Sequence, residues 1–329
     1  MTPLFSARLL PAAPARGLTL RAAAAAAAVA LLASACTTSR APDATPADTA
    51  TRNVIAQPLA ARANGIAVRP GDGARIVTDD RNNALLVAAD QASPRTLASV
   101  PAVAGQANSL SQPVFAAPGV LLVSRFGFGT AGTVFVVDQG QAAPLAGLAP
   151  QRRRLGLASL GAGRALSSWF VKDGAAPITG GVSLVTYDTA THAASERDLV
   201  VGLAKPVGVA VSGDTVFVSD QSRGAILRYS LNALLAASAP ANGGPVFASV
   251  DGPDLLAADA HGALYTKCRA HGVCRIAPDG TLTQLAGDFE DARGVAIDET
   301  RHRLYVVDRA RSSNAPSLIR TIDLDGAHP

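Results

Sequence analysis

Residues 205–230 read KPVGVAVSGDTVFVSDQSRGAILRYS, and residues 64–89 read NGIAVRPGDGARIVTDDRNNALLVAA, so the chain carries two versions of one pattern. Gly65 aligns with Gly208, and Asp79 aligns with Asp220. Each copy contains three short apolar runs, rich in β-branched residues and separated by Gly, Asp or Asn. This arrangement predicts three short β-strands joined by turns.

The same pattern recurs along the chain. Clear copies cover residues 293–308 and 254–268, and weaker copies begin at Gln112 and Leu155. The six units are equivalent at Gly65, Pro113, Gly156, Gly208, Leu255 and Gly294, which lie 48, 43, 52, 47 and 39 residues apart. A period of about 40 to 50 residues is typical of propeller blades, because one four-stranded sheet cannot bury both faces until neighbours pack on it.

The two ends of the repeat region complement each other. The last unit ends after its third strand, whereas residues 53–60, NVIAQPLA, read as a strand without a unit. We expect this strand at the outer edge of the last blade, because closing the ring removes an unpaired junction. The sequence therefore predicts an all-β, six-bladed β-propeller of four-stranded blades over residues 53–329.

Residues 1–35 have the plan of an export signal: arginines without acids, then an apolar run from residue 22 to residue 35. The run is shorter than the ~20 apolar residues of a membrane-spanning helix. It ends in LLASAC, which resembles the lipobox of bacterial lipoproteins and implies lipidation of Cys36. The alternative is an ordinary signal peptide with Cys36 incidental.

Residues 36–52 then read as a lipidated cysteine and a flexible tether, rich in Thr, Ala and Pro. Thr37 resembles the second mature residue of lipoproteins sorted to the outer membrane. We therefore expect a lipoprotein of the cell envelope, anchored to a membrane, facing the periplasm and monomeric.

The charge of the chain excludes one class of partner. The net charge is +4, and removal of Arg8, Arg16 and Arg21 with the leader leaves +1. A nearly neutral body gives no reason to expect nucleic acid, which requires clustered basic residues. We expect the run of three arginines at 152–154 to be a solvated loop.

Cys268 and Cys274 end one predicted strand and begin the next. In an oxidising compartment they predict a disulfide across a hairpin. The alternative is a metal site with His261 and His271, although the spacing of the cysteines is wider than in zinc knuckles.

The units resemble NHL repeats and the six-bladed propellers of the gluconolactonase and TolB-like groups, over about residues 53 to 325. In the gluconolactonase family, a divalent cation in the channel is held by Glu, Asn and Asp and polarises a lactone or ester carbonyl. The resemblance places Asp254 at that Asp and makes Asn64 a possible oxygen ligand. The family's Glu has no match, and Val207 stands where its Asn is expected.

Two rings of residues are candidates for ligand contact. The first precedes the shared glycine position and comprises Asn64, Gln112, Leu155, Val207, Asp254 and Arg293. The second ends the second strands and comprises Asp79, Arg125, Trp169, Asp220, Cys268 and Asp308. An Asp in the second ring either caps its own turn or contacts ligand. Trp169 either packs between blades or forms a recognition face with Arg125.

No nucleophilic motif stands out by its spacing. The run GFGTAG, residues 127–132, matches G-x-G-x-x-G, but a strand follows it instead of the helix that phosphate binding requires. We expect a non-catalytic module, without a cofactor, that binds a protein, a peptide or a small ligand or serves as a scaffold. The alternative is a lactonase-like hydrolase that uses Ca²⁺ or another divalent cation at Asn64 and Asp254.

Overall fold

The computed structural model describes residues 54–90, 92–312 and 314–324. The predicted signal peptide, Cys36 and the tether lie outside these residues. The described residues belong to one compact unit, and no helix among them is long and apolar enough to cross a membrane.

The first three sheets follow the chain, and within each the successive strands are antiparallel neighbours. Blade 1 contains β2 (Ala63–Val68), β3 (Arg75–Asp79), β4 (Ala84–Ala88) and β5 (Arg95–Ser99). Blade 2 contains β6 (Leu110–Ala117), β7 (Val120–Arg125), β8 (Thr133–Asp138) and β9 (Gln141–Pro144). Blade 3 contains β10 (Arg153–Gly161), β11 (Arg164–Val171), β12 (Thr179–Tyr187) and β13 (Ala194–Leu203).

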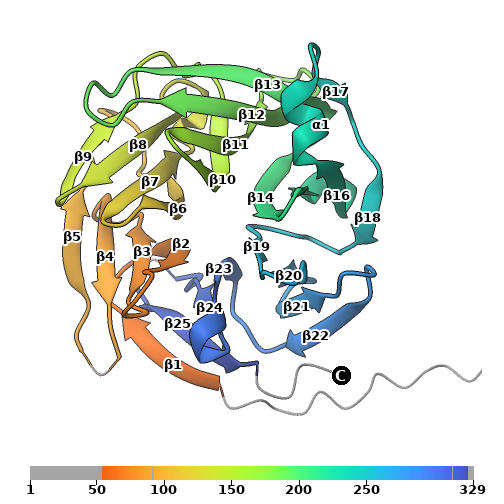
Figure 1. The fold of residues 1–329 in the computed structure, drawn as a ribbon. Helices are drawn as coiled ribbons and strands as arrows, with labels where there is room; N and C mark the ends of the chain where they lie inside the picture. Colours follow the sequence, from red (N-terminus) through yellow and green to blue (C-terminus); the bar gives the residue numbers. More distant parts are fainter. Residues whose placement is uncertain (1–53, 91, 313, 325–329) are drawn as a thin grey trace, which may run out of the picture. The chain divides into compact units, whose positions relative to one another are not determined.

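The last three sheets complete the ring seen in Figure 1. Blade 4 contains β14 (Pro206–Ser212), β15 (Thr215–Asp220), β16 (Ala225–Ser230) and β18 (Val246–Ser249). Blade 5 contains β19 (Ala257–Ala258), β20 (Leu264–Cys268), β21 (Gly272–Ile276) and β22 (Leu282–Ala286). Blade 6 contains β23 (Ala292–Asp298), β24 (Arg303–Asp308), β25 (Ser317–Asp323) and, at its outer edge, β1 (Val54–Leu59).

The predicted fold is confirmed, including the way the ring closes. Strand β1 pairs antiparallel with β25, so the first and last described strands share one sheet. One feature departs from the simple repeat. Between β16 and β18 the chain forms the short helix α1 (Leu231–Ala236) and then β17 (Ala241–Asn242), which joins blade 3 as a fifth, parallel strand.

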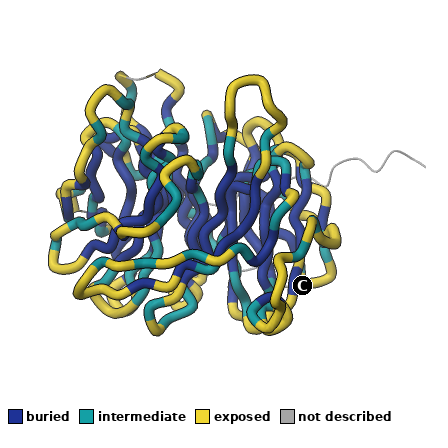
Figure 2. The backbone as a smooth tube through the Cα atoms, turned by 90° about the horizontal axis from the view of Figure 1, so that it is seen from above, coloured by how far each residue is buried: buried dark blue, intermediate teal, exposed yellow. Residues whose placement is uncertain are grey.

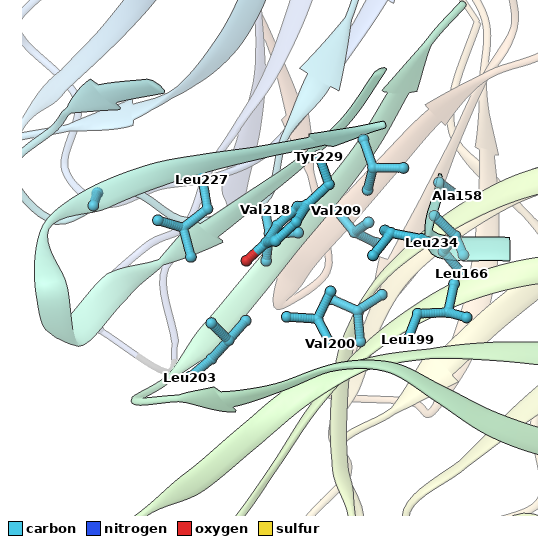
Figure 3. Packing of buried hydrophobic residues seen from close by; sticks show 13 residues of the cluster. Ala158, Leu166, Leu199, Val200, Leu203, Val209, Val218, Leu227, Tyr229 and Leu234 are labelled. Carbon is cyan, nitrogen blue, oxygen red and sulfur yellow. The ribbon is translucent and has the colours of Figure 1, made fainter. Parts of the chain in front are cut away.

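The apolar core of the described residues is divided among the contacts between neighbouring blades. Six clusters are present, and each joins two consecutive blades. In Figure 3, Val200 and Leu203 of blade 3 lie against Val218 and Leu227 of blade 4. The strands are therefore buried, whereas the turns between them are exposed, as Figure 2 shows.

The shared glycine permits close approach of the innermost strands. A Cβ atom on Gly208 would lie 2.6 Å from the Asp254 carbonyl oxygen, and one on Gly294 would lie 2.7 Å from the Asn64 carbonyl oxygen. Both distances are shorter than real Cβ contacts allow. The repeat thus keeps glycine where the backbone of the next blade passes.

A buried hydroxyl on the second strand fixes the same contact. Ser219 Oγ accepts a hydrogen bond from the Gly208 N–H (2.6 Å) and donates to the Asp254 carbonyl (2.7 Å) of the next blade. Ser168 does the same between Gly156 (2.8 Å) and Val207 (2.6 Å). These serines stabilise the contact between blades as well as the blade itself.

The structure corrects one position in the predicted rings. A Cβ on Gly65 would meet the carbonyl of Ser111, so Ser111, one residue before Gln112, is equivalent to Asn64. Gln112 rather than Pro113 therefore stands at the shared glycine position, and its N–H donates to Ser124 Oγ as the Gly65 N–H donates to Thr78 Oγ1. At the end of the second strand of blade 5, Cys268 keeps its predicted place, because the Arg269 N–H donates to the Asp251 carbonyl as the Gln221 N–H after Asp220 donates to the Lys205 carbonyl.

The prediction of a solvated loop at residues 152–154 is wrong. Strand β10 begins at Arg153, and Arg154 is 0% exposed. Arg154 pairs with Glu196 (2.8 Å), and Arg152 pairs with Glu196 (3.0 Å) and Asp198 (2.7 Å). The carboxylates that bury these arginines come from β13, more than forty residues away in sequence.

Two further predictions are confirmed. The run 127–132 forms a short 3-10 turn and is followed by β8, which pairs antiparallel with β7, so no phosphate-binding helix begins there. Cys268 and Cys274 form a disulfide across the β20–β21 hairpin, with 5.7 Å between their Cα atoms.

Candidate functional site

Residues at the start of the innermost strands converge on one end of the central channel. Two adjoining pockets lie there and share Phe126, Leu155, Asp254 and Arg293. We call the larger one, about 570 Å³, the Asp80 pocket and the other, about 480 Å³, the Lys205 pocket. The corrected first ring lines them, and its members are Asn64, Ser111, Leu155, Val207, Asp254 and Arg293.

Asp254 and Arg293 form an ion pair at the boundary of the two pockets. Arg293 Nη1 lies 3.2 Å from Asp254 Oδ2, and its Nε donates to Asp291 at 2.8 Å. Asp291 also accepts from Lys267 Nζ at 2.8 Å. Burial raises the pKa of Asp254, although the Arg293 charge opposes this shift. Asp254, Arg293, Asp291 and Lys267 thus form a small network in which acidic and basic side chains alternate.

The donors at this end do not fit a hard divalent cation. Such a cation takes about six to eight oxygen ligands, several of them carboxylates. Asp254 is the candidate carboxylate, but one of its oxygens faces the Arg293 guanidinium, whose charge repels a metal. Asn64 turns its amide N–H toward the Leu110 carbonyl (2.9 Å). Among the described residues no group of three or more His, Cys, Asp or Glu could hold a metal ion.

The Lys205 pocket has an excess of positive charge. Its lining includes Arg153, Lys172, Lys205 and Arg293, whereas Asp254 is its single carboxylate. Lys205 Nζ donates to the Gln221 amide oxygen at 2.6 Å. Burial lowers the pKa of Lys205, and the nearby charges of Arg293 and Lys172 lower it further, against the opposing effect of Asp254. The lining of this pocket therefore carries more basic than acidic side chains.

The Asp80 pocket contains a buried carboxyl group, that of Asp80, whose pKa lies above the ordinary value of an aspartate. Asp80 pairs with Arg309 at 3.0 Å, and its side chain is 8% exposed. Its Oδ1 atom is buried without a hydrogen-bond partner. Burial raises the pKa of Asp80 to about 6, although Arg309 opposes the shift. Asp80 therefore changes charge near neutral pH.

The aspartates of the second ring hold backbone groups. Asp220 accepts from the Ala204 and Lys205 N–H groups at 2.9 and 2.8 Å. Asp308 accepts from the Glu290 and Asp291 N–H groups at 2.9 and 3.0 Å. Both fix the loop that enters their blade, and through it they position Lys205 and Asp291 beside the pockets.

Trp169 and Arg125 do not form a recognition face. Trp169 is 6% exposed and lies under Arg152, whose guanidinium is 3.8 Å from the ring centre. Arg125 donates to the carbonyls of Ala131 (2.8 Å) and Pro101 (3.0 Å). Neither residue lines the two pockets.

Sequence reasoning identified part of this site. Asn64, Asp254 and Arg293 were expected from their position before the shared glycine, and the structure brings them to one end of the channel. Reasoning missed Lys205, Arg153 and Asp80. A signal for Lys205 was present, because it is one of only three lysines in the sequence and stands two residues before Val207 of the first ring.

Comparisons with known proteins bear on the fold. No family model and no curated protein matches the chain. Among solved structures, a gluconolactonase from Xanthomonas campestris is 17% identical with a TM-score of 0.60, over 85% of this chain and 96% of that one. The likeness shows the fold.

Two other solved structures have the same architecture. The calcium-binding protein regucalcin from Agrobacterium tumefaciens is 16% identical with a TM-score of 0.58, over 81% of this chain and 92% of that one. Virginiamycin B lyase from Staphylococcus aureus is 10% identical with a TM-score of 0.53, over 82% and 98%. A gluconolactonase, a calcium-binding protein and a lyase thus share this fold, so the function must be argued from the site.

Proposed function

We propose that the propeller is a non-catalytic ligand-binding module of the bacterial cell envelope, and that its ligand occupies the channel end formed by the Asp80 and Lys205 pockets. The observation that supports this proposal is the convergence of residues from all six blades on two adjoining pockets of about 570 and 480 Å³. Pockets of this size suit small molecules or a peptide side chain.

The second candidate is a metal-dependent lactonase-like hydrolase. The fold shared with the Xanthomonas campestris gluconolactonase favours it, and Asp254 and Asn64 lie at the same end of the channel as the proposed ligand. The pairing of Asp254 with Arg293 is the argument against it. A hydrolase of this kind requires the carboxylate to be free for the cation.

Elemental analysis and a lactonase assay on residues 53–329 distinguish the two candidates. This segment suits the test because the ring closes within it. We expect no stoichiometric divalent ion and no turnover of gluconolactone. One equivalent of a divalent ion that is lost in Asp254→Ala, or turnover that Asp254→Ala abolishes, would overturn the binding function and establish the enzyme.

We also propose that the propeller is tethered to a membrane through lipid on Cys36. The motif before Cys36 supports this, and acyl chains contribute about 0.8 kcal/mol for each buried methylene. Fractionation of cells that express the full chain and Cys36→Ser is the test. We expect the variant to be exported and released from membranes. Continued membrane attachment after export would refute lipidation.

A further inference from the structure

The Lys205 pocket is a place where cations lie together without carboxylate partners. Arg75, Arg154 and Arg320 are the most buried arginines, and each pairs with a carboxylate. In the Lys205 pocket, by contrast, Arg293 takes the carboxylate of Asp254. No described carboxylate forms an ion pair with Arg153, Lys172 or Lys205. Three positive side chains therefore remain around a pocket of about 480 Å³.

Arg153 is oriented by aromatic rings instead of by an acid. Its guanidinium carbon lies 5.3 Å from the centre of the Phe126 ring and 5.9 Å from that of Phe170. Its Nε atom is buried and has no hydrogen-bond acceptor among the described residues. A guanidinium stacked in this way keeps its outer N–H groups free for a planar anion, which it can bind with two parallel hydrogen bonds.

The same pocket has an apolar wall. Phe126 and Phe170 contact edge to face, with 5.7 Å between their ring centres, and Leu155, Ile178 and Val207 also line the pocket. Burial of a ligand's apolar body against these side chains contributes about 25 cal/mol for each Å² removed from water. Charge at one side and aromatic surface at the other select a ligand with both properties.

We propose that the Lys205 pocket binds a small carboxylate or phosphate that carries an aromatic or apolar body. The anion lies between Arg153, Lys172 and Lys205, and the body packs on Phe126 and Phe170. This assignment rests on the proposed binding function and names its ligand class. It requires no metal and no catalytic step.

Isothermal titration calorimetry at low salt with residues 53–329 tests the assignment. The probes are benzoate, phenyl phosphate, inorganic phosphate and the neutral benzamide. The variants are Lys205→Gln and Arg153→Gln. The matched control is Arg228→Gln, because Arg228 also stacks on a phenylalanine, Phe247 at 5.2 Å, but lies outside both pockets.

We expect benzoate and phenyl phosphate to bind the unsubstituted protein, and at least tenfold more weakly to Lys205→Gln and Arg153→Gln. Arg228→Gln should bind as the unsubstituted protein does, and 0.5 M NaCl should weaken the binding, since the anion is held by charge. Inorganic phosphate and benzamide should each bind at least tenfold more weakly than phenyl phosphate. Equal binding of benzamide and benzoate, unchanged affinity in both pocket variants, or no binding of either aromatic anion at millimolar concentration would overturn the assignment.

Leu155→Trp separates this assignment from the proposed function, because Leu155 lines both pockets. If benzamide binds in place of the anions and Leu155→Trp prevents it, the channel end is a binding site and the anionic class is wrong. If probes bind and Leu155→Trp affects none of them, both proposals are wrong.

Discussion

Removing the Ser219 hydroxyl should weaken the contact between blades 4 and 5. Ser219 is fully buried, and its Oγ links the Gly208 N–H to the Asp254 carbonyl. In Ser219→Ala both backbone groups lose this partner, and a buried polar group left unsatisfied costs about 1–3 kcal/mol. We therefore expect the free energy of unfolding to fall by about 2–6 kcal/mol for the two groups together.

The matched control comes from the repeat itself. Blade 1 carries Thr78 at this place, and Thr78 Oγ1 accepts from the Gly65 N–H at 2.7 Å. Ser219→Thr keeps the hydroxyl and should therefore lose less than about 1 kcal/mol. The assay is urea unfolding followed by the fluorescence of Trp169, the single tryptophan, which is buried in blade 3. A loss below about 0.5 kcal/mol in Ser219→Ala, or equal losses in the two variants, would refute the role of the hydroxyl.

Two further predictions concern stability. The pKa of Asp80 is raised to about 6 in the folded protein. Between about pH 4 and pH 6 the folded protein therefore binds more protons than the unfolded chain. The stability that Asp80 contributes falls as pH rises through this window. The measurement is the free energy of unfolding of the unsubstituted protein and of Asp80→Asn at pH 4 and at pH 7. Between these two pH values the unsubstituted protein should lose about 2–3 kcal/mol relative to the variant. Parallel pH profiles of the two proteins would contradict this. The disulfide joins cysteines separated by 6 residues, so it closes a short loop in the unfolded chain. The double variant Cys268→Ser, Cys274→Ser should therefore lose about 2 kcal/mol of unfolding free energy. The unsubstituted protein should lose the same amount in reductant. Equal stability with and without reductant would show that the bridge contributes nothing.

Local patterns were sufficient to predict the fold. The repeated glycine and the alternation of short apolar runs with turns depend on neighbouring residues, so they are visible in the sequence. The closing role of β1 also followed from a count of strands. The register of blade 2 did not, because this blade has Gln112 in place of the shared glycine, so the pattern alone places the unit one residue too far along the chain.

The candidate site was less accessible to sequence reasoning because its properties are not local. Arg154 is buried by Glu196, which lies 42 residues later, so the arginine run looked like a solvated loop. Lys205 and Arg153 come from different blades and meet at the Lys205 pocket through the ring. Asp254 could be placed correctly from the sequence. Its ion-pair partner, Arg293, lies 39 residues later in sequence, and the charge of this arginine opposes metal binding by Asp254.

The position of β1 also determines the order in which the protein can fold. Ala63, the first residue of β2, follows β1 closely in sequence. Its N–H donates to the hydroxyl of Ser317, 254 residues later. Blade 6 is therefore incomplete until the end of the chain is available, while blades 1 to 5 are each built from strands close in sequence. Pairing over such a separation is slow, because loop closure costs entropy before it yields contacts. A chain that ends before β25 would leave β1 unpaired and present an open edge, so aggregation of shortened chains is the expected consequence.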